Sequence, residues 1–220
     1  MGGKRLVKTD NMKKAIDTFG QLTFEQGKYF LPPYTKAGMD PVKATADDAE
    51  KIMKWLSWEN VVRIRGEVAY KFITAKRTPT VFNQQIIDCI WVMLHYTYNN
   101  GETRQPWELL DSVIMHEGGC VKMSFIVNKQ YLVNVIPISS KFDADNIYLE
   151  EKEYQASECK STTRYLVVTR DKKLLLDARN AKVTFPIQYI VLTGEGLEEE
   201  VHEPVKINYL KVNEESKKMS

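Results

Sequence analysis

The residues of this chain best suited to chemistry are cations that recur along one stretch of its first half. Arg63, Arg65 and Lys71 alternate with apolar residues, and further cations stand shortly before and after them. The complete set is Lys51, Lys54, Arg63, Arg65, Lys71, Lys76 and Arg77. Ammonium and guanidinium groups bind phosphate oxygens, and several acting together bind nucleic acid in a salt-dependent manner. The set predicts contacts with DNA phosphates, and ordinary solvated surface cations are the alternative.

Motifs for nucleophilic, phosphate-binding or metal chemistry do not occur in the sequence. It contains no Gly-x-Ser-x-Gly, no glycine-rich loop leading into a helix and no His-Glu-x-x-His. The histidines and cysteines are widely spaced, unlike zinc ligands: His95, His116, His202, Cys89, Cys120 and Cys159. We therefore expect reduced thiols, no metal site, no cofactor and no catalytic residues.

Two helices are expected near the start of the chain. Apolar residues recur at the helical period over 12–20, and Gly20 can adopt the positive φ that ends a helix. Thr23 and Gln26 have the spacing of a capping box for the second helix, which the Pro-Pro pair at 32–33 ends.

A third helix and a hairpin are expected next. Thr45 can cap this helix, which is expected to end between Trp55 and Trp58. Between Val62 and Phe72 the apolar period falls from about 3.6 to about 2 residues, which predicts two strands turning around Arg65-Gly66. Three helices and a hairpin are the order of a winged helix-turn-helix, in which the third helix enters the major groove of DNA and the hairpin contacts the backbone. The two lysines of the third helix would then face the groove.

The net charge of +2 over 220 residues conceals an asymmetry. Residues 1–82 hold 15 Lys and Arg against 9 Asp and Glu, whereas the remainder holds 16 against 20, which gives net charges of +6 and −4. A basic first part and an acidic second part fit one module that faces nucleic acid and another with a different partner. The sequence has neither an apolar stretch of membrane-spanning length nor a signal-peptide region, so we expect a cytoplasmic protein that does not enter membranes.

The second half alternates helical and strand patterns. Helices are expected over 81–94, 107–115, 143–156 and 172–180, and strands over 121–127, 131–138, 164–169, 187–193 and 205–212. Residues 128–130 would join the first two strands as a hairpin, and the helix over 172–180 would make its flanking strands parallel. The apolar helix over 81–94 is expected to join the two parts and supply core to both. The sequence thus predicts an α+β chain with a winged-helix domain over 1–78, a small α/β domain over 79–212 and a flexible tail over 213–220.

Three segments carry a resemblance to a known family. They are the hairpin strand at 61–66, the strand at 131–136, and the strand at 165–169 with Arg170-Asp171 after it. In this order they resemble the replication-relaxation family of plasmid and conjugative-element proteins. The resemblance implies a winged helix-turn-helix followed by a domain similar to the restriction-endonuclease fold. It also implies a DNA-binding accessory protein that serves the replication, transfer or transcription of a mobile element.

Metal-dependent nucleases of that fold require an acidic residue and then, on the next strand, an acid and a lysine two places apart, which hold Mg²⁺ and position the nucleophile. The strand concerned reads Asn134-Val135-Ile136 and has neither group. Glu150 and Lys152 have the required spacing, but an acidic helical face explains them at least as well. We expect a degenerate nuclease-like scaffold used for binding, with a metal-dependent nuclease as an alternative.

The leading hypothesis is thus a non-enzymatic protein that binds double-stranded DNA. Besides the nuclease, the second alternative is an adaptor that binds other proteins. Aromatic residues such as Trp55, Trp58 and Tyr70 are enriched at interfaces, although a small winged module would more readily bury them in its core. The acidic second half offers a surface for a protein partner, and the apolar helix over 81–94 offers one for a homodimer.

Overall fold

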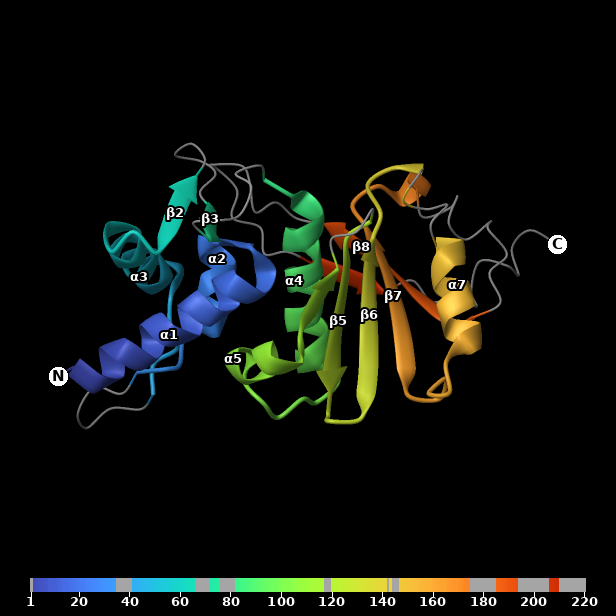
Figure 1. Cartoon of the computed structure of the whole chain (residues 1–220), viewed down its shortest axis with the longest axis horizontal. Helices are drawn as coiled ribbons and strands as arrows, with labels where there is room; N and C mark the ends of the chain where they lie inside the picture. Colours follow the sequence, from blue (N-terminus) through green and yellow to red (C-terminus); the bar gives the residue numbers. More distant parts are fainter. Residues whose placement is uncertain are drawn as a thin grey trace.

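The computed structural model describes residues 2–34, 41–65, 72–75, 82–116, 120–141, 143, 147–174, 185–193 and 206–209. The molecule is elongated, with the amino-terminal helices at one end, a large sheet at the other and helix α4 between them (Figure 1). No helix in these described ranges is long and apolar enough to cross a membrane.

The amino-terminal part combines helices with a small antiparallel sheet. Its elements in chain order are α1 (Gly2–Phe19), β1 (Gln21–Thr23), α2 (Phe24–Gly27), the 3-10 helix η1 (Lys28–Phe30), α3 (Ala46–Trp58), β2 (Val62–Arg65) and β3 (Phe72–Ala75). The strand order is β1-β3-β2, with both pairings antiparallel. This part therefore follows the order helix, strand, helix, helix, strand, strand.

The expected end of α1 and the expected starts of α2 and α3 are confirmed, but the expected start of the first helix at residue 12 is wrong, because α1 begins at Gly2 in a segment without the apolar helical period. Gly20 has a φ of 74°, and its N–H donates to the carbonyl of Ile16 at 2.8 Å, which closes α1. Thr23 and Gln26 form both bonds of a capping box, and Thr45 forms a second one with Asp48. Local polar chemistry thus sets where three of these helices begin or end.

Two details of the small sheet differ from the expectation. Strand β1 was not predicted, because a three-residue strand has no period of its own and forms only against β3. Arg65 pairs with Phe72, so the strands are joined through residues 66–71 and not by a tight turn around Arg65-Gly66. The alternation of polar and apolar residues continues on both sides of Gly66 and therefore does not locate the turn.

A six-stranded mixed sheet forms the second part. Its elements are α4 (Gln84–Asn99), α5 (Pro106–Leu109), the 3-10 helix η2 (Leu110–Ser112), β4 (Ile114–His116), β5 (Lys122–Val127), β6 (Tyr131–Pro137), α7 (Ile147–Ala156), β7 (Thr163–Thr169), β8 (Ile187–Thr193) and β9 (Lys206–Tyr209). The strands lie in sequence order, with β6–β7 and β7–β8 parallel and the other pairs antiparallel. The expected α+β class and partly parallel sheet are confirmed.

Most boundaries of the second part agree with the sequence analysis. The hairpin turn at 128–130 has positive φ at Asn128 (52°) and Lys129 (56°), as a tight antiparallel connection requires. The helix expected over 107–115 is wrong in its second half, because residues 114–116 form β4 against β5. Of the helix expected over 172–180, only residues 172–174 are described, and the tail at 213–220 lies outside the described residues.

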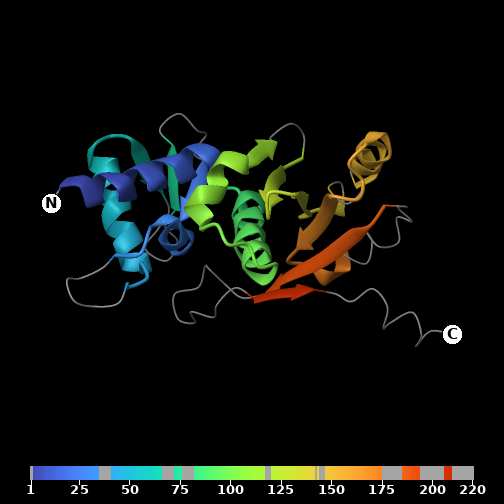
Figure 2. The ribbon, with the colours of Figure 1, turned by 90° about the horizontal axis from the view of Figure 1, so that it is seen from below.

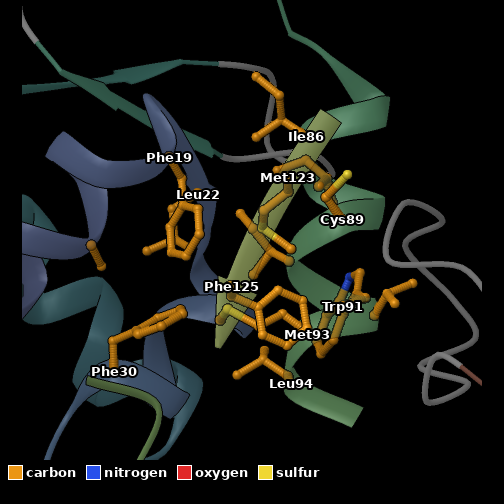
Figure 3. Packing of buried hydrophobic residues seen from close by; sticks show 14 of the residues in the cluster. Phe19, Leu22, Phe30, Ile86, Cys89, Trp91, Met93, Leu94, Met123 and Phe125 are labelled. Carbon is orange, nitrogen blue, oxygen red and sulfur yellow. The ribbon is translucent and has the colours of Figure 1, made fainter. Parts of the chain in front are cut away.

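Helix α4 supplies core to both parts, as expected from its apolar sequence. One cluster of buried side chains joins Phe19, Leu22 and Phe30 of the amino-terminal part to α4 and to Met123 and Phe125 of β5 (Figure 3). Polar contacts reinforce the junction: the fully buried Gln26 donates from Nε2 to the carbonyl of Ile87 at 2.8 Å. The described residues on the two sides of the predicted boundary thus share one core. Residues 76–81, which contain the boundary itself, lie outside the described residues.

Candidate nucleic-acid interface

One side of α3 is exposed along its whole length. Asp47, Lys51, Lys54 and Trp58 follow one another at intervals of four, three and four residues and are all exposed; we call them the α3 stripe. The opposite side of the helix contributes Ala49, Met53 and Leu56 to the core, each with no exposed surface. Burial of one side therefore fixes which side chains α3 presents outward.

The positive charge of the α3 stripe is concentrated in its middle. Lys51 is exposed, and Lys54 Nζ lies 2.9 Å from Glu50 Oε1 with 61% of the lysine side chain exposed. An exposed ion pair of this kind contributes about 1 kcal/mol or less, so a phosphate can replace Glu50 as the partner of Lys54. Acidic residues occupy the first turn, where Asp48 accepts the Thr45 N–H at 3.0 Å. The beginning of α3 is therefore unsuited to binding an anion. A phosphate could be bound only further along the helix, at the two lysines and towards the end of α3.

Arg63 and Arg65 lie on a different surface from the two lysines. Arg63 pairs with Thr74, which pairs in turn with Gln21, so these residues share one face of the small sheet. Leu22 and Val62 occupy the other face and are buried in the core against the helices. The structure thus brings Lys51 and Lys54 together and Arg63 and Arg65 together, but it does not combine them into one row.

The two arginines differ in their surroundings. Arg63 is exposed, whereas Arg65 is half-buried and its Nε has no hydrogen-bond partner in the part of the chain that the structure describes. Three further predicted contacts, Lys71, Lys76 and Arg77, lie outside the described residues.

Trp58 is the residue that the sequence analysis placed wrongly. It was expected in the core, but its side chain is 89% exposed. The signal was present in the sequence, because Trp58 follows Lys54 by four residues and Lys51 by seven and must share their side of the helix. Trp55, in contrast, is partly buried against the core.

The strand to which the resemblance assigns an acid and a lysine carries Asn134 in a hydrogen-bonded network instead. On β5 and β6, Ser124 Oγ donates to Asn134 Oδ1 at 2.7 Å and lies 3.3 Å from His116 Nε2. Ser124 and Asn134 are both buried. The three groups can hold one another in place, but they bring no carboxylate to a metal ion.

Glu150 is ion-paired with Lys122, so its carboxylate already has a cationic partner within the protein. Lys122 Nζ of β5 lies 3.0 Å from both Glu150 oxygens and 2.9 Å from Glu153 Oε2, whereas Lys152 is exposed. Partial burial lowers the pKa of Lys122, but hydrogen bonds from it to Glu153 and Glu150 outweigh burial and raise that pKa. Burial raises the pKa of Glu150 more than Lys122 lowers it. No group of three His, Cys, Asp or Glu side chains that could hold a metal ion occurs among the residues with described placement.

Comparison with known proteins adds no evidence on family or function. No family model, no curated protein and no solved structure matches this chain.

Proposed function

We propose that the amino-terminal part is a winged helix-turn-helix that binds double-stranded DNA through the α3 stripe. The observation that carries the proposal is the order helix, strand, helix, helix, strand, strand, with the strands arranged β1-β3-β2, together with two exposed lysines on the outward side of α3. In such a module α3 enters the major groove, and the connection between β2 and β3 lies along the backbone. Lys51 and Lys54 then bind phosphates or base edges, and Arg63 supports the complex from its own surface.

The second part completes the proposal as a binding scaffold without enzymatic activity. We infer a degenerate restriction-endonuclease-like domain, because β6, the second strand of the β5–β6 hairpin, pairs in parallel with β7, and because these strands carry Ser124 and Asn134 in place of the acids that would hold a metal. Within a mobile element of the replication-relaxation type, such a protein would act as an accessory in replication, transfer or transcription. Fold analogy alone supports this biological setting.

Charge variants on α3 test the proposal. Lys51→Ala and Lys54→Ala should each weaken binding to any duplex and reduce the salt slope by about one. Lys152→Ala is the matched control, because this exposed lysine stands on α7 at the far end of the molecule from α3 (Figure 2). Equal affinities and slopes for all three variants and the unchanged protein would contradict the assignment.

A protein-interaction adaptor is the second candidate, and one surface favours it. Ile114, Ile126 and Leu132 are 58%, 38% and 38% exposed, and the strand register places all three on one face of the large sheet. Apolar side chains gathered in this way are typical of protein-binding sites. Binding through them should be insensitive to salt and should be abolished by Ile126→Asp. The helix over 81–94 does not offer a dimer interface, because Ile86 to Leu94 are buried in the monomer.

A further inference from the structure

Trp58 differs from the other tryptophans of the chain. Trp91 is 7% exposed, and Trp55 and Trp107 are partly buried against the core, whereas Trp58 is 89% exposed. An indole carries a large apolar surface and is highly buried on average in folded proteins. Its exposure at the end of α3 therefore indicates that a flat ring is presented to a partner.

The backbone holds Trp58 in a defined position. The chain leaves α3 through Asn60, which has a φ of 58°. Asn60 N–H donates to the carbonyl of Ser57, and Val61 N–H donates to the carbonyl of Leu56, both at 3.0 Å. These are the two bonds of a Schellman motif, which satisfies carbonyl groups in the last turn of α3 and fixes the direction in which the chain leaves the helix. The backbone that carries the indole is therefore already ordered, and binding has to order only the side-chain torsions of Trp58.

The neighbours of Trp58 identify the chemistry of its partner. Lys54 and Lys51 precede it by one and two helical turns on the same stripe, so a partner that covers the ring also meets two ammonium groups. A nucleobase attached to its phosphates provides a flat π surface and negative charge together. Bases inside a duplex are paired and stacked on one another, so unpaired bases with accessible faces occur in bulges and single-stranded segments.

We propose that Trp58 stacks on an unpaired nucleobase, so that α3 prefers DNA in which a duplex meets a single strand. The proposal rests on the proposed function, because it takes the α3 stripe as the DNA-binding surface. Lys51 and Lys54 hold the backbone at the junction, and the indole covers the first base beyond the paired segment. Stacking requires no particular base, so the preference is for structure and not for sequence.

Fluorescence anisotropy with two probes tests the proposal: a blunt duplex, and the same duplex with a single-stranded overhang. The unchanged protein should bind the overhang probe more tightly. Trp58→Ala should lower affinity for this probe roughly 5- to 100-fold while affinity for the blunt duplex and both salt slopes stay the same. Trp58→Phe should retain most of the preference because phenylalanine also stacks. Tyr98→Ala is the control, since Tyr98 is 84% exposed at the end of α4, outside the α3 stripe.

The outcomes separate this inference from the proposed function. If Lys51→Ala weakens binding but Trp58→Ala changes neither probe, the stacking role is wrong and the DNA-binding surface stands. An equal loss on both probes would assign Trp58 to paired DNA and also overturn the inference. Absence of binding to either probe would refute the proposed function itself. Thermal unfolding of each variant verifies folding, because an exposed side chain should leave Tm unchanged.

Discussion

Removal of Arg170 should destabilise the protein in a strongly pH-dependent way. Asp88 of α4 accepts hydrogen bonds from Arg170 Nη2 at 2.8 Å, from Arg170 Nε at 2.9 Å and from Gln84 Nε2 at 2.8 Å. The side chains of Asp88 and Arg170 are 9% and 30% exposed. The pair ties the central helix to the residue that follows β7, so its loss affects the connection between α4 and the large sheet.

The magnitude follows from the burial of the two partners. Breaking a fully buried pair costs about 3–5 kcal/mol, and a surface pair contributes about 1 kcal/mol or less. Because Arg170 is partly exposed, we expect Arg170→Leu to cost about 2 kcal/mol at neutral pH, between these limits. For a chain of this size, that corresponds to a fall in Tm of roughly 4–8 °C.

The pH dependence follows from the pKa of Asp88. Burial raises this pKa above its usual value of 3.8 and outweighs the hydrogen bond and charge of Arg170, which lower it. A raised pKa means that the folded state binds the proton more tightly, so the resulting stability is present at acidic pH and is lost as pH rises through the raised pKa. Arg170→Leu raises that pKa further. Its cost should therefore be largest at neutral pH and should shrink as the medium is acidified.

Urea unfolding of four proteins at neutral and mildly acidic pH measures this effect. Besides the unchanged chain and Arg170→Leu, the set contains Asp88→Asn and the double variant. The double variant should be more stable than Arg170→Leu at neutral pH, because it no longer buries an unpaired charge. The reasoning is refuted if the cost of Arg170→Leu is the same at both pH values, or if Asp88→Asn gives no rescue.

Three further predictions concern the stability of the fold and the proposed lack of nuclease activity. Hydrogen bonds from Arg104 lower the pKa of Glu102 to about 2 from its usual value of 4.5. Glu102→Gln should therefore lower the free energy of unfolding by about 2 kcal/mol at neutral pH, and by progressively less as pH falls below 4.5. Urea unfolding measures this cost, and a cost independent of pH would contradict the prediction. A Cβ on Gly27 would lie 2.5 Å from Cε of the fully buried Met53 and 3.2 Å from the Cβ of Ala49, so Gly27→Ala should lower stability by about 1–2 kcal/mol. An unchanged or higher Tm would show that the Met53 side chain can move aside without cost. Incubation with Mg²⁺ or Mn²⁺ should leave supercoiled and single-stranded DNA intact, and cleavage that Glu150→Ala abolishes would overturn the non-enzymatic assignment.

Features encoded by neighbouring residues could be predicted from the sequence. The capping box of Thr23 and Gln26 and the turn at Asn128-Lys129 depend on local hydrogen bonds and on backbone conformation. Helix α4 was predictable because its apolar residues surround it on nearly every side, which only a central position satisfies.

Features that depend on distant partners could not be predicted in the same way. Strands β1 and β4 have three residues each and exist because β3 and β5 pair with them. The partner of Glu150 is Lys122, 28 residues away on β5, and nothing in the local sequence around either residue indicates this pairing. The separation of Arg63 from Lys51 likewise follows from the sheet register and not from charge pattern.

Binding of the unchanged protein to a random-sequence duplex, followed by fluorescence anisotropy at about 50 and about 200 mM salt, tests the central claim most directly. If α3 and the strand beside it bind phosphates, affinity should fall steeply, by about an order of magnitude or more, between these two concentrations. Absence of binding at the lower salt concentration, or affinity that does not change with salt, would contradict the account and favour the apolar face of the large sheet as the functional surface.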